Sequence, residues 1–407
     1  MDESNPAAFN GPSWSPNAAN VGLAKLSLPN TTDPPSASNP PSQKVWLIFG
    51  ATGHMGRSVT KAALSHGDIV SAVGQLFEDT PSSMENWHDD PDRYLGLLCD
   101  VRLRETVATV IEKTMKQFGR VDIIANCAGY GVIGACEDQD EHEIRNQFET
   151  NFMGTLNLIQ LSLPYFRKRR AGRYLIFSST SGALGVPGLG PYCATKYAVE
   201  GLIESMLYEV DQFSIRVTLV EPGHLRRDDV HVMDNGQRLP MFGHFKVAKA
   251  SEPYMGKDAP AAHAQRALHW IGDNQPTSVV KAAELIWQLG HCSYPPLRLL
   301  LGSFAVDSIR DRLKSIIEEI EDWKHLSFPP LEGHEETPPE DGEGDGGEED
   351  ADAEGGRDDD DDDEDEDEEE NAPPEGDQGV PRESAADADD HSIKNEHRMD
   401  VDVDVDD

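Results

Sequence analysis

Residues 45–66 read VWLIFGATGHMGRSVTKAALSH, and this stretch decides the fold. An apolar run, three glycines and a helical pattern follow one another directly, which predicts a strand, a glycine turn and a helix. Gly50, Gly53 and Gly56 let the backbone turn sharply and approach a diphosphate, while the helix start offers free N–H groups. A plain tight turn after a strand has the same pattern, so the stretch alone leaves the ligand open.

Six further apolar runs follow at the intervals of β-α-β units, at 69–73, 95–100, 121–126, 174–179, 215–223 and 297–302. Helical patterns separate most of them, as in ETVATVIEKTMKQFG at 105–119. This alternation predicts an α/β fold: a Rossmann-like, doubly wound parallel sheet of about seven strands, covered on both faces. The pattern extends over a single domain at 44–330.

The two ends of the chain have a different composition. Residues 1–43 are rich in Pro, Ser, Asn and Thr, which predicts a disordered N-terminal arm. From 332 to 407 there are 37 acidic and 4 basic residues, a net charge of -33 out of -40 for the whole chain. Residues 331–407 are therefore expected to form a disordered acidic tail. Such a tail either attracts a basic protein partner or only keeps the chain in solution, and it does not bind nucleic acid directly.

The five cysteines are widely spaced and lack the spacing of a metal site or a disulfide framework, so we expect no metal and a reducing compartment. No run of 18 apolar residues occurs, and the first residues do not resemble a signal peptide. We therefore expect a soluble protein without a membrane span, located in the cytoplasm, with a nuclear location left open.

A second informative stretch is SSTSGALGVPGLGPYCATK at 178–196. Tyr192 and Lys196 are four residues apart in a helical pattern, so both side chains lie on one helix face. An ammonium beside a phenol favours phenolate and lowers the phenol's pKa, which suits a general acid/base. Ser179 ends the apolar run YLIFSS, and a strand end can meet a helix start. The Tyr-x-x-x-Lys pattern alone is more often a surface pair.

Taken in order, the motifs of residues 44–327 resemble the short-chain dehydrogenase/reductase family, in particular its longer members that act on ketones, steroids or retinoids. The matching segments are GATGHMG at 50–56, Asp100-Val101, Asn126-Cys127-Ala128-Gly129, Asn151 in ETNFMG, the set Ser179, Tyr192 and Lys196, and Glu221-Pro222-Gly223. Six motifs in the family's order are far more specific than any one of them.

The resemblance implies that residues 44–330 are an NAD(P)-binding catalytic domain. The implied activity is that of an NAD(P)(H)-dependent oxidoreductase that interconverts a secondary alcohol and a carbonyl. Tyr192 would be the general acid/base, Ser179 would polarise the substrate oxygen, Lys196 would lower the tyrosine pKa and hold the nicotinamide ribose, and Asn151 would support a water in the proton relay. The implied cofactor-binding residues are Gly50, Thr52, Gly53, His54, Met55, Gly56, Gln75, Asp100, Val101, Asn126, Ala128, Gly129, Tyr192, Lys196, Pro222 and Gly223. Relatives commonly form dimers or tetramers, so the resemblance also implies a homo-oligomer.

Three positions depart from the family's pattern. His54 stands where the coenzyme loop usually has its middle glycine, and Arg227 where a threonine usually touches the carboxamide. These departures leave open a catalytically weak NADP-binding sensor, and the tail leaves open an interaction protein that binds a basic partner. Gln75 follows the second apolar run and no acid stands at its end, which favours NADP over NAD because a carboxylate there would repel the 2′-phosphate.

The segment 224–270 is expected to form a lid over the substrate. Its large apolar side chains suggest a small, apolar substrate, although they could equally only pack the lid: Met233, Met241, Phe242, Phe245, Tyr254 and Met255.

Overall fold

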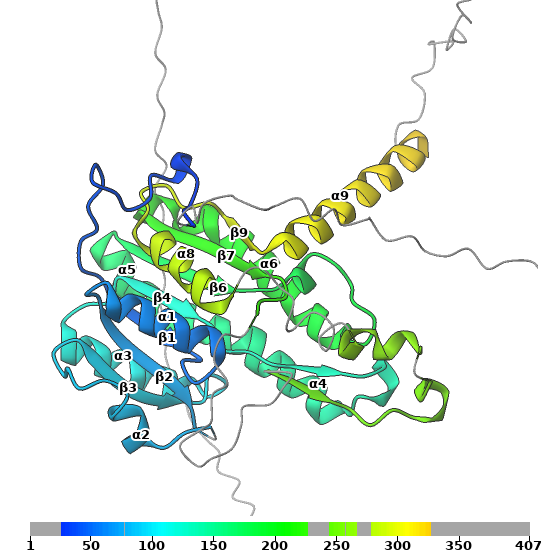
Figure 1. The fold of residues 1–407 in the computed structure, drawn as a ribbon, viewed down its shortest axis with the longest axis horizontal. Coiled ribbons are helices and arrows are strands. Elements are labelled where there is room, and N and C mark those ends of the chain that lie inside the picture. The colour runs from blue at the N-terminus through cyan, green and yellow to red at the C-terminus, as the bar shows by residue number, and fades with distance from the viewer. Residues whose placement is uncertain (1–25, 77, 227–243, 257, 267–277, 327–407) are drawn as a thin grey trace, which may run out of the picture. The chain divides into compact units, whose positions relative to one another are not determined.

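A seven-stranded parallel sheet forms the centre of the domain in the computed structural model (Figure 1). The structure describes residues 26–76, 78–226, 244–256, 258–266 and 278–326. The strands of the sheet are β1 Val45–Phe49, β2 Ile69–Gln75, β3 Tyr94–Cys99, β4 Ile123–Asn126, β6 Gly172–Phe177, β7 Ile215–Pro222 and β9 Arg298–Leu301. Each coincides with one of the seven apolar runs, so the predicted Rossmann-like fold is confirmed.

The strand order is β3-β2-β1-β4-β6-β7-β9. The order reverses between β1 and β4, and in open α/β sheets ligands bind at the carboxyl ends of the strands beside such a reversal. All five residues of β1 are buried, as expected for a central parallel strand with helices on both faces.

Helices cover both faces of the sheet. On one face α1 (His54–Ser65) and α8 (Val279–His291) share a core, to which Ala63 and Ile286 contribute. On the other face lie α3 (Arg104–Phe118), α5 (Gly154–Arg169) and α6 (Gly190–Val210), with Val110, Leu158 and Ile203 in their core. Three more helices are α2 Pro81–Glu85, α4 Glu141–Phe148 and α9 Ser303–Trp323.

A second sheet of two strands, β5 (Gly131–Ile133) and β8 (Phe245–Val247), lies outside the main one. Within the described residues, no helix combines the length and apolarity needed to cross a membrane. Short 3-10 turns occur at Asn30–Thr32, Cys136–Asp138, Thr180–Gly182, Asp211–Phe213, Glu252–Tyr254, Pro260–Ala262 and Lys324–Leu326.

The N-terminal arm begins to pack earlier than its composition predicted. Leu28 is buried in the α1/α8 core, and its amide donates to Gln288 Oε1 at 3.0 Å. The Thr32 carbonyl accepts a hydrogen bond from the Tyr294 amide. One buried leucine and a few hydrogen bonds therefore attach part of residues 26–43 to α8 and the residues that follow it. Residues 1–25 and the acidic tail at 331–407 lie outside the described residues.

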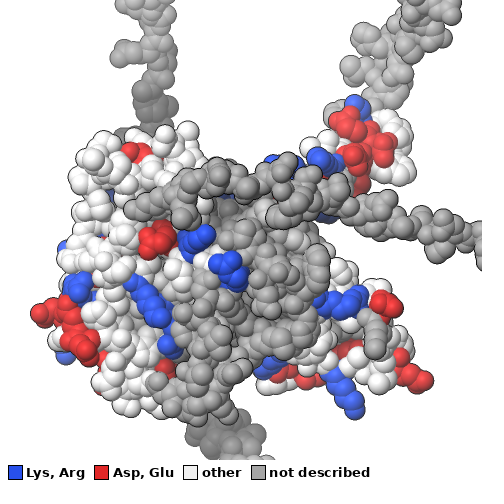
Figure 2. Space-filling view, in the orientation of Figure 1, with Lys and Arg blue, Asp and Glu red and all other residues white. Residues whose placement is uncertain are grey.

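Asp68 connects α8 to the sheet through hydrogen bonds of its carboxylate. Its carboxylate accepts hydrogen bonds from the indole N–H groups of Trp46 and Trp287, at 2.9 and 3.0 Å, and lies 2.8 Å from His291 Nε2. Asp68 is 2% exposed, so these partners stabilise a buried acid at the amino-terminal edge of the sheet. Figure 2 shows basic and acidic side chains both present on the outer surface of the described part, in contrast to the charge of the tail.

Candidate active site

The glycine turn joins β1 to α1, and each of its glycines has a different environment. Gly50 has a φ of +73°, in the left-handed region that favours glycine. A Cβ on Gly56 would lie 2.2 Å from the Gly50 carbonyl oxygen, so this glycine lets the helix approach the strand end. A Cβ on Gly53 would meet only that same oxygen, at 3.4 Å, and no side chain caps the helix start after it. The middle of the turn is thus open, and it presents uncapped N–H groups that suit a diphosphate.

Asn151 lies on a π-helical turn, Glu149–Met153, between α4 and α5. Its side-chain carbonyl accepts from the Tyr130 amide at 3.0 Å, and its amide group donates to the Tyr130 carbonyl at 2.8 Å and to Thr195 Oγ1 at 2.9 Å. Asn151 is 1% exposed. This residue therefore joins the loop after β4 to helix α6, and π turns of this kind recur at functional sites.

Ser179 and Tyr192 meet where β6 ends and α6 begins. The Ser179 side chain accepts from the Ser181 amide at 3.2 Å and is hydrogen-bonded to the Tyr192 side chain. The Tyr192 ring packs edge-on against Phe245, with 5.1 Å between ring centroids. Phe245, predicted as part of the lid, thus lies beside the phenol.

Lys196 lies one turn after Tyr192 on α6 and is buried. Its ammonium donates to the Phe177 carbonyl at 2.9 Å and lies 5.7 Å from the centroid of the Tyr192 ring. A Cβ on Gly129 would lie 2.9 Å from Asn151 Oδ1 and 3.5 Å from Lys196 Nζ, so both side chains converge on this glycine. The four predicted catalytic residues therefore lie around one site.

The titration of this site differs from the sequence-based expectation. Burial raises the pKa of the Tyr192 phenol above its usual value, and the hydrogen bond with Ser179 only partly opposes this. Burial also lowers the pKa of Lys196 to about 8, which the Glu200 carboxylate opposes. The expected lowering of the tyrosine pKa is thus absent here, because burial disfavours the phenolate and Lys196 is itself desolvated. Tyr192 is protonated near neutral pH in this form.

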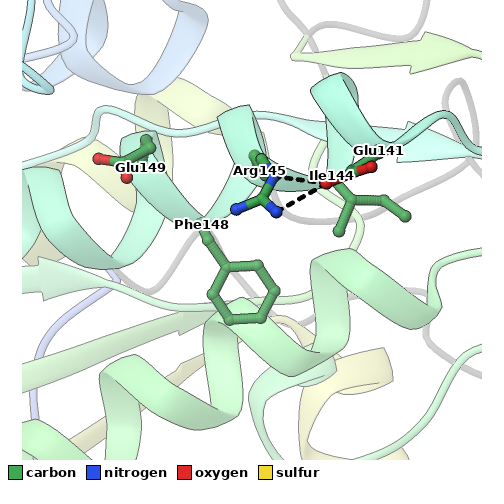
Figure 3. Close-up of a pocket in the computed structure, with 5 residues that line it drawn as sticks. All are labelled: Glu141, Ile144, Arg145, Phe148 and Glu149. Atoms are coloured by element: carbon green, nitrogen blue, oxygen red, sulfur yellow. Dashed lines mark hydrogen bonds and ion pairs between the residues drawn. The ribbon is translucent and has the colours of Figure 1, made fainter.

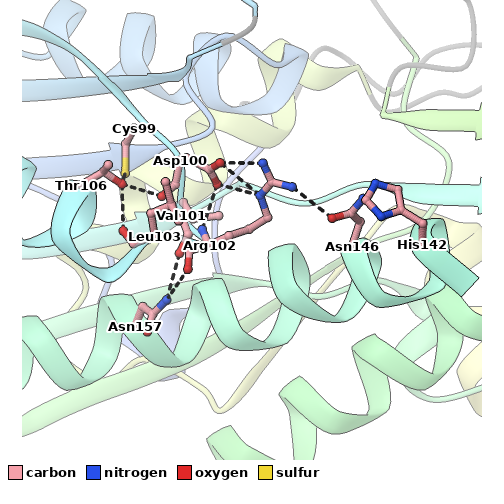
Figure 4. Close-up of polar contacts among 9 residues, drawn as sticks. All are labelled: Cys99, Asp100, Val101, Arg102, Leu103, Thr106, His142, Asn146 and Asn157. Atoms are coloured by element: carbon pink, nitrogen blue, oxygen red, sulfur yellow. Dashed lines mark hydrogen bonds and ion pairs between the residues drawn. The ribbon is translucent and has the colours of Figure 1, made fainter. Parts of the chain in front are cut away.

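Asp100 and Val101 follow β3 (Figure 4). The Asp100 carboxylate pairs with the Arg102 guanidinium at 2.6 Å, and the hydrogen bond from Arg102 lowers the pKa of Asp100. The Val101 carbonyl accepts from Asn157 on α5 at 3.1 Å. Both residues lie at the carboxyl edge of the sheet, but the Asp100 carboxylate is engaged within the protein.

Asn126 ends β4 and shapes the turn that follows it. Its side chain accepts from the Ala128 amide at 3.2 Å and donates to Thr155 at 2.9 Å. A Cβ on Gly50 would lie 2.7 Å from the Ala128 nitrogen, so this turn packs directly on the glycine turn. The segment 126–129 therefore lies directly beside the glycine turn, at the carboxyl ends of β1 and β4.

The end of β2 holds an acid that the sequence analysis missed. Gln75 is the last residue of β2, and its carbonyl accepts a hydrogen bond from the Glu78 amide at 3.1 Å. The chain thereby folds back, and Thr52 of the glycine turn donates to the Glu78 carboxylate. The premise that no acid stands here is wrong, because a tight turn moves Glu78 back to the strand end.

Other predicted residues lie around the turn and the strand ends. His54 begins α1 and is half-buried, and Met55 packs against the α1/α8 core. Pro222 ends β7, and the Gly223 amide donates to the Leu301 carbonyl at 3.0 Å. In the lid, Tyr254 hydrogen-bonds with Glu137 and Met255 is 68% exposed. Arg227, Met233, Met241 and Phe242 lie outside the described residues.

Two surface pockets lie elsewhere and contain none of the predicted site residues. A pocket of about 380 Å³ lies along α4, where Arg145 pairs with Glu141 (Figure 3); its other lining residues are Ile144, Phe148 and Glu149. A second, of about 600 Å³, lies between α1 and α2 and includes Arg57, whose guanidinium lies 4.1 Å from the centroid of the Trp87 ring.

Comparison with known proteins gives the family. The model of the short chain dehydrogenase family matches residues 44–235. The chain is 30% identical to Oxidoreductase BOA17 of Botryotinia fuckeliana over 285 residues, which cover 70% of this chain and 98% of that protein. It is 35% identical to the 3-ketodihydrosphingosine reductase of Bacteroides thetaiotaomicron over 180 residues, 44% of this chain and 63% of that protein.

A solved structure agrees with this result. The fold resembles that of a short-chain dehydrogenase from Streptomyces avermitilis with a TM-score of 0.61 and 32% identity, over 70% of this chain and 98% of that one. The chain belongs to the short-chain dehydrogenase family, and it is an oxidoreductase with an NAD(P)-binding Rossmann fold that acts on alcohol or carbonyl groups.

Proposed function

We propose that the domain at 44–330 catalyses NAD(P)(H)-dependent interconversion of a secondary alcohol and a carbonyl, with Tyr192 as the general acid/base. The observation that carries this proposal is the convergence of Ser179, Tyr192 and Lys196 between the end of β6 and the start of α6. A buried phenol that keeps its proton near neutral pH can donate it to a carbonyl oxygen during reduction.

The other site residues support this chemistry by position. Ser179 is hydrogen-bonded to Tyr192 and can share the substrate oxygen with it. Lys196 supplies a positive charge 5.7 Å from the phenol ring, and Asn151 fixes the loop of Tyr130 against α6. When bound, the nicotinamide supplies the hydride chemistry.

The open glycine turn, with Gly53 at its centre, would hold the diphosphate of the cofactor, and its neighbours Thr52, His54 and Met55 would surround it. The segment Asn126–Gly129 and the turn at Pro222 and Gly223 would face the nicotinamide half. Asp100, Val101 and Gln75 would border the adenosine half.

The preference between NAD and NADP depends on Glu78. The sequence favours NADP, but a carboxylate bound to Thr52 would repel a 2′-phosphate and accept a ribose hydroxyl instead. Arg57, which could have met a phosphate, lies over Trp87. We therefore propose that Glu78 shifts the preference toward NAD.

The substrate is proposed to be a small, apolar alcohol or ketone. Phe245 packs against Tyr192 and gives this side of the site an apolar wall. The similarity to a 3-ketodihydrosphingosine reductase, which is named for a ketone substrate, supports a ketone.

The direct test is an assay of the purified full chain with NADH and NADPH against a panel of aliphatic, cyclic and aromatic ketones, and with NAD and NADP against the corresponding alcohols. Coenzyme oxidation that depends on a ketone supports the proposal. Tight coenzyme binding without turnover of any compound would instead favour the sensor.

The chain is proposed to form a homo-oligomer through α4, α5 and α6. Large apolar side chains are exposed along these helices and the π turn: Phe148 36%, Met153 37%, Tyr165 37% and Tyr197 45%. Light scattering of the full chain and of Tyr197→Glu tests this, because an interface here predicts dissociation of the variant. Capture of basic proteins by the full chain, lost on truncation after Leu331, would assign a partner to the acidic tail.

A further inference from the structure

A buried polar cluster lies beside the candidate active site, and Glu221 is its one member that belongs to a segment matching the family's motifs. Its members are Ser178, Glu200, Glu221 and Arg298, with Glu204 at its outer end. Glu200 is 4% exposed, Glu221 0% and Ser178 5%, so the cluster is inside the domain. Buried carboxylates destabilise a fold unless they are paired, and this arrangement requires a physical explanation.

Four separate elements bring the cluster together. Glu200 lies on α6, one turn after Lys196, and Ser178 directly follows β6. Glu221 is on β7, and Arg298 begins β9, the neighbouring strand. The cluster therefore spans the strand ends immediately behind Ser179 and Lys196.

Glu200 is the centre of this cluster. Its carboxylate accepts a 2.6 Å hydrogen bond from Ser178 Oγ and a charged hydrogen bond from Arg298. Arg298 also donates to the carboxylates of Glu221 and Glu204. A Cβ on Gly182 would lie 1.9 Å from Glu200 Oε1, so the turn after Ser179 packs directly on this carboxylate.

Among the residues that the structure describes, no carboxylate forms an ion pair with the buried Lys196. The hydrogen bond of Lys196 goes to the Phe177 carbonyl, a neutral group. The titratable groups that affect or face it are Tyr192 and Glu200 on its own helix and Cys127 after β4. Among these, Glu200 is the only carboxylate, and it is the strongest influence that keeps the pKa of Lys196 up against burial.

We infer that Glu200 is a positioning residue for the reaction. Lys196 donates to the Phe177 carbonyl, and Glu200, one helical turn further along α6, accepts from the next residue of the same strand end, Ser178. The Glu200 carboxylate thus balances the charge of the buried ammonium and holds the strand end that carries Ser179. This inference rests on the proposed function, because it takes Lys196 and Ser179 as part of the reacting site. Arg298 and Ser178 hold the carboxylate in place, and Glu221 and Glu204 are the other acids that share the arginine.

The charge of Lys196 makes the activity depend on pH. Lys196 has a pKa of about 8, so activity that needs its charge falls as the pH rises through that value. Without the opposing charge of Glu200, the pKa of Lys196 falls by about one unit, since a nearby opposite charge shifts a pKa by one unit or more. The midpoint of the alkaline loss of activity then moves to about pH 7. Relative to wild type, the variant's activity at pH 7.5 is about threefold lower than its activity at pH 6.

The experiment measures kcat and kcat/KM from pH 5.5 to 9.5 for the full chain, with the ketone found active. The variants are Glu200→Gln, Glu200→Asp and the matched control Glu204→Gln, which removes an acid bound to the same arginine at the surface. We expect the midpoint of the alkaline loss of activity to move to lower pH for Glu200→Gln. It should stay within about 0.3 pH units of wild type for Glu200→Asp, which keeps the charge, and should not change for Glu204→Gln.

If a folded Glu200→Gln enzyme loses activity at the same alkaline pH as wild type, the inference is overturned. This holds even if its rate is lower by the same factor at every pH, because such a loss indicates a role of Glu200 in packing alone. If Glu200→Gln does not fold, Glu200→Asp provides the test. A midpoint of the alkaline loss of activity that differs from wild type by one pH unit or more, despite the retained charge, contradicts the inference. Full turnover by Tyr192→Phe would show that the proposed function fails. An inactive Tyr192→Phe with an unshifted Glu200→Gln would show that only this inference fails.

Discussion

Asn151 on the π turn donates a 2.9 Å hydrogen bond to Thr195 on α6, although the two residues are 44 positions apart in the chain. Thr195 is fully buried, and its own hydroxyl donates to the Tyr192 carbonyl at 2.7 Å. One hydroxyl thus connects the helix that carries Asn151 with the residue proposed as acid/base. The relative position of these two groups depends on a side chain that no family motif identified.

Thr195→Val removes this hydroxyl while keeping the shape of the side chain. The unsatisfied Asn151 amide should cost about 1–2 kcal/mol of unfolding free energy. A shift of Asn151 and Tyr192 relative to each other should lower kcat about tenfold. Denaturant unfolding and steady-state kinetics measure both effects. The control is Thr109→Val, an exposed threonine that bonds to the helix carbonyl of Glu105, and it should change neither.

Alanine substitutions at two glycines of the turn should have different effects on stability and on coenzyme binding. Gly56→Ala places a methyl group against the Gly50 carbonyl and should destabilise the domain by roughly 1–3 kcal/mol. Gly53→Ala makes only an ordinary contact with that oxygen, at 3.4 Å, so stability should stay within about 1 kcal/mol while the methyl group lowers coenzyme affinity. Thermal unfolding and coenzyme titration separate the two effects. Undiminished coenzyme binding by Gly53→Ala would place the diphosphate elsewhere.

Glu78→Gln tests the coenzyme preference. The neutral amide keeps a hydrogen bond with Thr52 but no longer repels a phosphate, so the kcat/KM ratio of NADP(H) to NAD(H) should rise roughly tenfold. Asp79→Asn, next in the chain, is the control and should leave the ratio unchanged. Equal ratios for wild type and Glu78→Gln would remove Glu78 from the adenosine site.

The ionisation of Glu221 should make the unfolding free energy of the domain depend on pH. Burial, together with the charge of Glu200, raises the pKa of this fully buried acid to about 7, above its value of 4.5 in an unfolded chain. Its contribution is therefore complete below about pH 4.5 and is lost as the pH rises through 7, by at most about 3 kcal/mol. The unfolding free energy of Glu221→Gln should decline less than that of wild type between pH 5 and 7.5. Parallel curves would contradict the raised pKa.

The sheet and the four catalytic candidates could be predicted from the sequence because their signals lie within short stretches of the chain. Each central strand is a continuous buried run, as in Val45–Phe49, and Tyr192 and Lys196 are one helical turn apart. The contacts that the sequence did not reveal join residues far apart. Thr52 and Glu78 are 26 positions apart, and Glu200 and Arg298 are 98 apart. Such polar pairs carry no periodicity, so only the fold shows them.

The contacts made by part of the N-terminal arm were not evident from the sequence for a similar reason. Composition describes a whole segment, whereas the packing of residues 26–43 depends on Leu28 and a few backbone hydrogen bonds. The expected lowering of the Tyr192 pKa failed because sequence spacing gives the distance between the phenol and Lys196 but not how deeply both are buried.

The central claim is that Tyr192 transfers the proton while the cofactor transfers the hydride. The measurement that tests it most directly is single-turnover oxidation of enzyme-bound reduced coenzyme by an active ketone, compared between wild type and Tyr192→Phe. We predict that Tyr192→Phe binds the coenzyme with wild-type affinity and reduces the ketone at least about a hundredfold more slowly. Wild-type turnover by Tyr192→Phe would contradict the proposed mechanism.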